Sequence, residues 1–255
     1  MPPPTLTARI RHAEHVMGTV VSFDVPLSAR HDGSLEAAVR WLHWVDGVFS
    51  PYRPDSDVSK LARADVTLDG CAPEVAEVLA ACASVREASG GYFTTSPGGR
   101  FDPSGYVKGW AVQRAASLLS GAGSTDHLVN GGGDVQCAGG RAGEPWRVGI
   151  ADPFRPAALA LVLAVSDCAV ATSGTAERGP HIIDPFTGRP PSGLASLTVI
   201  GPSLALADAY ATAAFAMGPA RARDWTSCLD GHEAYAITSV GDSWQTPGFA
   251  RHIVG

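Results

Sequence analysis

The chain has 255 residues, of which 45% are apolar and 17% are charged, and its formal net charge is −6 at pH 7. This composition supplies enough apolar surface for one large domain or for two lobes that share a core, and it excludes a disordered chain. The acidic balance, with no block of basic residues, argues against nucleic acid as a partner, because such binding depends on clustered Lys and Arg.

Cysteine spacing and the N-terminal sequence indicate a cytoplasmic protein. The five cysteines are scattered, and no pair has Cys-x-x-Cys spacing. We therefore expect buried thiols rather than a zinc site or a disulfide framework. The N-terminal stretch MPPPTLTARIRHAEHVMG contains no apolar run of the signal-peptide kind, and we expect no membrane insertion. We expect a single domain over residues 1–255, with residues 1–14 as a loose N-terminal arm.

The first half of the chain predicts one strand and three helices. Residues 16–25 are rich in β-branched side chains and predict a strand. Apolar residues recur at helical spacing over 33–50. A second amphipathic helix is expected over 73–89, where a proline stands at the start and two glycines follow the end. A third helix is expected over 107–120.

The second half of the chain predicts mostly strands. The expected strand segments are rich in apolar and β-branched residues and are bounded by Gly, Pro and Asp; they cover 127–140, 146–153, 158–174, 194–202 and 234–238. The segment 158–174 is long enough for one or two buried strands. One further helix is expected over 205–218. Because helices and strands are mixed without regular βα alternation, we predict an α+β fold with a largely antiparallel sheet and flanking helices.

Two polar residues interrupt the otherwise apolar helix ALADAYATAAFAMG. Asp208 and Thr212 are four residues apart, so both lie on one helix face. A buried carboxylate needs a hydrogen-bond partner or a cation. Two interpretations follow: the Asp208 carboxylate bonds to the Thr212 hydroxyl, or both side chains supply oxygen ligands to a hard cation such as Mg²⁺.

Two other segments combine polar residues with turn chemistry. FDPSGYVKGWAVQ places Asp102 before a glycine turn and Lys108 at the start of a helix. It is either a capped helix with a solvated lysine or a site for a polar ligand at a helix N-terminus. HIIDPFTGRP places His181 beside a Gly/Pro turn. This histidine is either an ordinary surface residue or a group that takes a proton near neutral pH.

The glycine-rich stretch NGGGDV does not fit a phosphate-binding loop. It lacks both the G-x-G-x-x-G pattern and a Lys-Ser/Thr pair after the glycines. We interpret it as a strand with a bulge, or as a strand to which other backbone approaches closely. Asp134, which follows the glycines, is expected to be a turn residue rather than a ligand.

Nine stretches, taken together and in order, resemble the ApbE family of FAD:protein FMN transferases. They span about residues 16–218 and read MGTVVSFDV, SPYRPDSDVSKL, SGGYF, FDPSGYVKGWAVQRAA, LVNGGGDV, WRVGIADP, ATSG, HIIDPFTGRP and LTVIGPSLALADAYATAAFAMG. The resemblance implies an ApbE-like fold with an FAD cleft. It also implies cleavage of FAD at its pyrophosphate with a divalent metal, transfer of FMN to a Thr or Ser hydroxyl of a target flavoprotein, and release of AMP.

The resemblance implies roles for particular residues of this sequence. Residues expected to bind FAD are Met17, Tyr52, Tyr92, Phe93, Thr94, Asp102, Lys108 and Ile183. Residues expected at the metal, most simply Mg²⁺, are Asp208 and Thr212 through their side chains and Gly105 and Ala211 through their carbonyls. His181 is the expected base that takes the proton from the acceptor hydroxyl.

The sequence departs from the family pattern at two places, and two other activities stay open. Only eight residues, Thr94–Phe101, separate Phe93 from Asp102, and Thr94 stands where the family usually has Asp. The rim of the FAD pocket is therefore expected to be reduced. The segment TAERGP before His181 is also short. The alternatives to transfer are an Mg²⁺-dependent FAD pyrophosphatase that yields FMN and AMP, and an FAD-binding protein without turnover.

Overall fold

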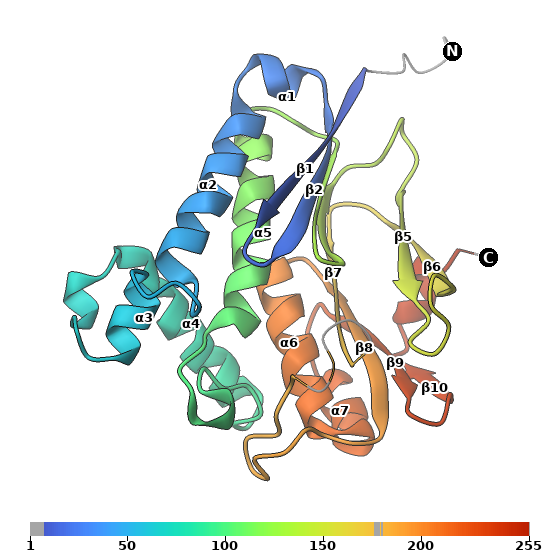
Figure 1. Cartoon of the computed structure of the whole chain (residues 1–255). Helices are drawn as coiled ribbons and strands as arrows, with labels where there is room; N and C mark the ends of the chain where they lie inside the picture. The colour runs from blue at the N-terminus through green and yellow to red at the C-terminus, as the bar shows by residue number, and fades with distance from the viewer. Residues whose placement is uncertain (1–7, 176–178, 180, 255) are drawn as a thin grey trace.

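The computed structural model describes residues 8–175, 179 and 181–254, and an eight-stranded sheet runs through the middle of it (Figure 1). The strand order is β1-β2-β3-β4-β7-β8-β9-β10, and every neighbouring pair is antiparallel. These strands are β1 (Arg9–Val16), β2 (Thr19–Pro26), β3 (His127–Gly131), β4 (Asp134–Ala138), β7 (Ala169–Gly174), β8 (Leu194–Gly201), β9 (Glu233–Thr238) and β10 (Ser243–Gln245).

Helices α2, α5 and α6 cover one face of this sheet (Figure 1). The helices are α1 (Ser28–His31), α2 (Ser34–Phe49), α3 (Asp57–Ala62), α4 (Pro73–Ala88), α5 (Ser104–Gly121), α6 (Leu204–Met217) and α7 (Pro219–Thr226), with 3₁₀ turns at Leu68–Gly70, Pro97–Gly99 and Phe249–His252. Their apolar faces and the sheet enclose the main core, to which α6 contributes a run of fully buried alanines. Small side chains there let α6 approach both α5 and the sheet closely.

A second, smaller sheet covers the opposite face. It consists of β5 (Trp146–Ala151) and β6 (Leu159–Val165), paired antiparallel. Its buried residues, such as Trp146 and Leu163, pack with Val135 and Ile200 of the large sheet in a second apolar cluster. Strand β8 is therefore covered on both faces, and all of its residues are buried, which explains its nearly continuous apolar sequence.

The predicted fold class is confirmed: helices and antiparallel strands are segregated into layers rather than alternating. The helices expected over 33–50, 73–89 and 205–218 are present as α2, α4 and α6, and the segment 158–174 forms two strands. Among the residues that the structure describes, no helix is both long and apolar enough to span a membrane.

The expectation of a loose arm over residues 1–14 is wrong for residues 9–14, which belong to β1; residues 1–7 lie outside the described residues. Strand β1 pairs with β2 along its whole length. The guanidinium of Arg9 anchors it by ion pairs to Asp24 at 2.5 Å and Asp126 at 2.7 Å. The many polar residues of this edge strand concealed it, because only one of its faces is partly buried.

Two other expectations need correction. The segment 127–140 is not one strand but the hairpin β3–β4. The third helix begins at Ser104, three residues before the expected start. An Asx turn, in which Oδ1 of Asp102 accepts the Ser104 N–H at 2.9 Å, starts the helix early. Lys108 consequently lies in the second turn of α5 rather than at its start.

Candidate functional site

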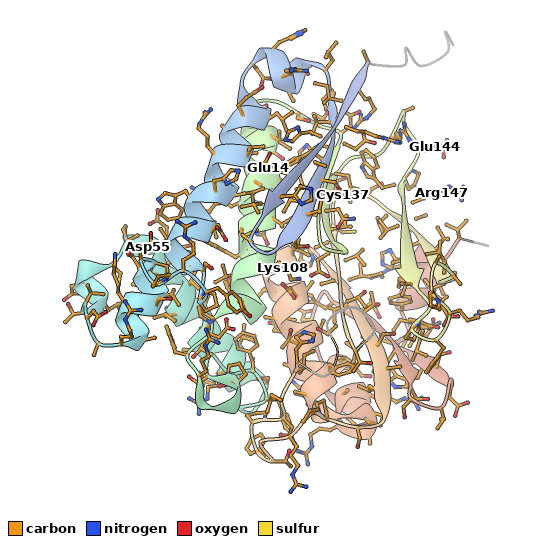
Figure 2. All side chains as sticks on the ribbon, viewed as in Figure 1. Glu14, Asp55, Lys108, Cys137, Glu144 and Arg147 are labelled. Atoms are coloured by element: carbon orange, nitrogen blue, oxygen red, sulfur yellow. The ribbon has the colours of Figure 1, made fainter. Side chains whose placement is uncertain are left out.

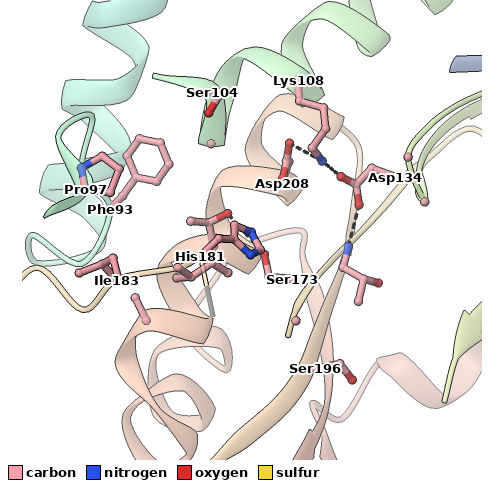
Figure 3. Close-up of a pocket in the computed structure, with 18 of the residues that line it drawn as sticks. Phe93, Pro97, Ser104, Lys108, Asp134, Ser173, His181, Ile183, Ser196 and Asp208 are labelled. Atoms are coloured by element: carbon pink, nitrogen blue, oxygen red, sulfur yellow. Dashed lines mark hydrogen bonds and ion pairs between the residues drawn. The ribbon is translucent and has the colours of Figure 1, made fainter. Parts of the chain in front are cut away.

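A cavity of about 540 Å³ opens between the helical layer and the large sheet. Its walls come from the first turns of α5, the middle of α6, the turn between β3 and β4, strand β7, and the segment after residue 181 (Figure 3). Part of β5 closes it from the side of the small sheet, through Gly149, Ile150 and Ala151. Segments far apart in the sequence therefore meet at one cavity.

Most of the residues singled out from the sequence line this cavity: Tyr52, Tyr92, Phe93, Thr94, Asp102, Gly105, Lys108, His181, Ile183, Asp208 and Thr212. Two others lie outside its lining. Met17 is at the β1–β2 turn with φ +55° and packs against the main core. Ala211 is completely buried within α6. The structure thus gathers the expected residues in one place, while their individual roles stay predictions.

The close contact of α5 with α6 places Lys108 beside Asp208. A Cβ atom at Gly109 would lie 2.5 Å from the Leu204 carbonyl oxygen and 2.9 Å from the Cβ atom of Asp208, so the two helices approach this closely only because residue 109 is glycine. The backbone N–H of Gly109 donates to Oδ2 of Asp208 at 3.0 Å. This bond satisfies one oxygen of the buried carboxylate.

Lys108 lies between two buried carboxylates (Figure 3). Its Nζ pairs with Oδ2 of Asp134 and lies 3.0 Å from Oδ2 of Asp208. The side chains of Asp134 and Asp208 are only 3% and 7% exposed, while that of Lys108 is 20% exposed. One ammonium offsets two carboxylates in water-poor surroundings, so the cluster keeps a net negative charge and favours a further cation.

The structure excludes one of the two interpretations for Lys108 and one for Asp208. Lys108 is not a solvated lysine, since it is paired near the middle of the molecule (Figure 2). The Asp208 carboxylate bonds to Lys108 and the Gly109 N–H, and the Thr212 hydroxyl instead lies 3.4 Å from the Ser173 hydroxyl. The expectation that Asp134 is a turn residue is wrong: it begins β4 and is 2% exposed.

The part of the cavity between α5 and α6 contains oxygen atoms that could act as metal ligands. Gly105 lies against Thr212, because a Cβ atom at Gly105 would be 3.8 Å from the Thr212 methyl carbon and 3.4 Å from the Phe93 ring. The carboxylate of Asp208 is one helical turn before Thr212. Over the described residues, no group of three His, Cys, Asp or Glu side chains could hold a metal ion. A donor set of one carboxylate, one hydroxyl and backbone carbonyls fits a hard cation that also takes substrate phosphates, rather than zinc.

The segment from residue 181 forms the solvent side of the cavity. His181 is exposed, and its Nδ1 lies 3.0 Å from the Gly179 carbonyl oxygen. Ile182 is buried against the main core, and both Ile182 and Ile183 line the cavity. The Asp184 carboxylate accepts hydrogen bonds from the Phe186 N–H and the Thr187 hydroxyl, and these bonds stabilise the turn. Of the short segment 175–180, residues 176–178 and 180 lie outside the described residues.

The sequence interpretation missed three features of the cavity. Asp134 and the Thr172 N–H that binds it come from neighbouring strands, and the Gly149–Ala151 stretch comes from the small sheet. Only for Asp134 did the sequence contain a signal, namely an acidic residue that follows the glycines of an apolar strand pair.

Comparison with known proteins defines the class. The model of the ApbE family matches residues 17–99 and 94–236, and this chain belongs to the ApbE family. The FAD:protein FMN transferase of Rhodobacter capsulatus is 32% identical over 237 residues, which cover 87% of this chain and 42% of that protein. The FAD:protein FMN transferase of Escherichia coli K12 is 34% identical over 161 residues, or 58% of this chain and 46% of that protein.

Solved structures show the same fold. The flavin transferase ApbE from Vibrio cholerae superposes with a TM-score of 0.85 at 22% identity, covering 96% of this chain and 99% of that one. The ApbE protein from Thermotoga maritima gives a TM-score of 0.85 at 23% identity, covering 97% and 100%. The chain spans less than half the length of the two curated relatives.

Proposed function

We propose that this protein transfers FMN from FAD to a Thr or Ser hydroxyl of a target flavoprotein and releases AMP. The observation that carries the proposal is the single cavity in which Lys108, Asp208, Thr212 and His181 meet. It provides a cation, oxygen donors for a metal, and an imidazole at one place. The similarity to relatives called FAD:protein FMN transferase supports the same activity.

FAD would lie along the cavity with its pyrophosphate beside Lys108. The ammonium is the cavity cation that a phosphate would meet at the first turns of α5. The remaining proposed FAD contacts are those expected from the sequence: Met17, Tyr52, Tyr92, Phe93, Thr94, Asp102 and Ile183. The Tyr52 side chain is 81% exposed, so it has apolar surface to cover with a ligand.

Mg²⁺ is the proposed metal, held by the side chains of Asp208 and Thr212 and the carbonyls of Gly105 and Ala211. The residues present fit such an ion, since they are oxygen donors in a cluster with net negative charge. When bound, the ion would offset the charge that develops on the AMP leaving group.

His181 is the proposed base. If its Nδ1–H donates to the Gly179 carbonyl, Nε2 carries the free lone pair, and the exposure of the side chain leaves it open to an acceptor. The hydroxyl of Thr or Ser is a poor nucleophile with a high pKa, and a positioned base typically accelerates its attack by about 10²–10⁴-fold.

Hydrolysis of FAD is the second candidate function, and the exposure of His181 favours it, because water reaches the same imidazole. The deciding experiment incubates the purified protein with FAD and Mg²⁺, with and without a flavin-acceptor domain. AMP release with an FMN-sized mass gain on the acceptor supports transfer. Free FMN and AMP without a mass gain support the pyrophosphatase, and unchanged bound FAD supports a binding protein.

We also propose a cytoplasmic site of action. The five cysteines are free thiols. Cys137 of β4 lies beside Cys168, the residue before β7, and the Cys137 N–H donates to the Cys168 carbonyl at 2.9 Å. Adjacent thiols persist most readily in a reducing compartment.

A further inference from the structure

We propose that Asp134 is a positioning residue that holds the Lys108 ammonium toward the bound pyrophosphate and away from full pairing with Asp208. The inference rests on the proposed function, in that Lys108 is taken to bind FAD. Asp134 acts through Lys108 and is not itself assigned a contact with substrate.

The β3–β4 turn brings Asp134 to the cavity. Gly132 and Gly133 have φ of +61° and +96°, and Oδ1 of Asn130 accepts the Gly133 N–H at 2.8 Å. Glycine tolerates both left-handed positions without strain. Asp134 is therefore the first residue after a tight, internally bonded turn, and its backbone position is well defined.

Helix α5 packs directly on this hairpin. A Cβ atom at Gly131 would lie 2.5 Å from a methyl carbon of Val112, so the helix and the strand approach closely only because residue 131 is glycine. Lys108 is four residues before Val112 and shares its helix face. The helix face that packs on the hairpin is thus the face that carries the ammonium.

A backbone contact orients the Asp134 carboxylate. Its Oδ1 accepts the Thr172 N–H of strand β7 at 2.9 Å, which leaves Oδ2 for the Lys108 ammonium. Both oxygens therefore have partners, as a carboxylate that is 97% buried requires. The dashed contacts of Figure 3 show this chain of interactions from β7 through Asp134 to Lys108 and Asp208.

The second carboxylate explains why a positioning residue is needed. Lys108 also lies 3.0 Å from Asp208, the proposed metal ligand. Without the charge of Asp134, Asp208 would be the one carboxylate left to the ammonium within this cluster. Lys108 would then compete with the metal for Asp208 and would be less available to a phosphate.

The positioning role predicts a change in FAD affinity on neutralisation of Asp134 that is opposite to the change expected from charge repulsion alone. Removal of a negative charge near an anion site normally strengthens anion binding, because repulsion decreases. If Asp134 positions Lys108, its neutralisation instead weakens FAD binding, because the cation is redirected. The two explanations therefore predict opposite changes in the same quantity.

The test measures FAD binding to the full chain by calorimetry in metal-free buffer containing EDTA. We expect Asp134→Asn to raise the Kd for FAD by ~10-fold, the loss of about one charge-assisted hydrogen bond. Asp134→Glu keeps the charge and should remain within ~3-fold of the unsubstituted protein, because the ion pair can re-form.

A double-mutant cycle shows whether the effect passes through Lys108. In a Lys108→Met background, Asp134→Asn should change the Kd by less than ~2-fold, because coupled residues are not additive. Asp24→Asn is the matched control: it breaks the Arg9–Asp24 ion pair, whose side chains are 13% and 15% exposed and which is remote from the cavity. It should lower the melting temperature without changing the Kd.

Three results would overturn the inference: an unchanged or lower Kd for Asp134→Asn, an equal change in the Lys108→Met background, or the same rise for Asp24→Asn. Failure of the proposed function looks different: without an FAD site the unsubstituted protein would bind no FAD in this assay, and without transfer it would bind FAD but add no FMN to the acceptor in the product assay.

Discussion

The cavity has two walls that differ in how they are held. The inner wall, made of Lys108, Asp134 and Asp208, comes from α5, β4 and α6 and is nearly buried. The outer wall, made of Tyr52 and His181, comes from loop segments and is exposed. Packing of α5, β4 and α6 positions the inner-wall side chains without a ligand. The outer-wall side chains are instead exposed to water and are not fixed by the core.

The difference between the two walls predicts which substitutions affect both stability and function and which affect function alone. Substitutions in the inner wall should alter both folding and function, because the same contacts support both. Substitutions in the outer wall should alter function with little effect on stability, because exposed side chains contribute little to the core. The following experiments test this division from the largest expected effect to the smallest.

Asp208→Ala should lower the rate of AMP release by about 10³-fold or more, since it removes the proposed side-chain carboxylate for the metal. The rate is measured by chromatography with FAD and Mg²⁺. Asp55→Ala is the control, because the Asp55 side chain is 70% exposed and lies outside the cavity lining. Unchanged activity in Asp208→Ala would remove this residue from the metal site.

His181→Ala should slow FMN transfer by about 10²-fold or more, because the acceptor hydroxyl loses its base. Its melting temperature and FAD affinity should stay close to those of the unsubstituted protein, since the side chain is exposed. His31→Ala, at an exposed position of α1, serves as the control. A marked fall in the melting temperature of His181→Ala, together with the fall in rate, would contradict the division between the two walls.

Gly109→Ala should destabilise the protein by about 2–4 kcal/mol, because the new methyl group would overlap the Leu204 carbonyl in the α5–α6 contact. Urea unfolding measures the free energy. Gly47→Ala is the matched control within helix α2: nothing lies within 4 Å of its Cβ position. It should be neutral or stabilise the protein by up to ~1 kcal/mol. Equal effects of the two substitutions would disprove the close helix contact.

Phe186→Ala should raise the KM for FAD by roughly 2–13-fold with little change in kcat, because an aromatic pair contributes about 0.5–1.5 kcal/mol. The Phe186 ring packs on Tyr92 of the cavity with centroids 4.8 Å apart. Val240→Ala, at a residue that is 81% exposed and outside the cavity, controls for loss of surface apolar area. A large loss of stability in Phe186→Ala would assign the ring to the core instead.

Local rules predicted the helices well and the edge strand poorly. Helix α4 begins at Pro73 as expected, since proline favours the first helical position. Helix α5 begins three residues before the start that its sequence predicts, because the Asx turn at Asp102 depends on side-chain geometry. Local sequence does not reveal strand β1, because its pairing with β2 and the Arg9 ion pairs to Asp24 and Asp126 are non-local.

The sequence by itself determined that Asp208 and Thr212 share one face of a helix, because the helical repeat places residues four apart side by side. It also determined the family, through short motifs along the chain. Only the tertiary structure decided that Asp134 joins Lys108 and Asp208, since these residues come from three elements. Glycines at positions 109 and 131 allow the close approaches that bring the charges together, and such contacts depend on packing rather than on local sequence.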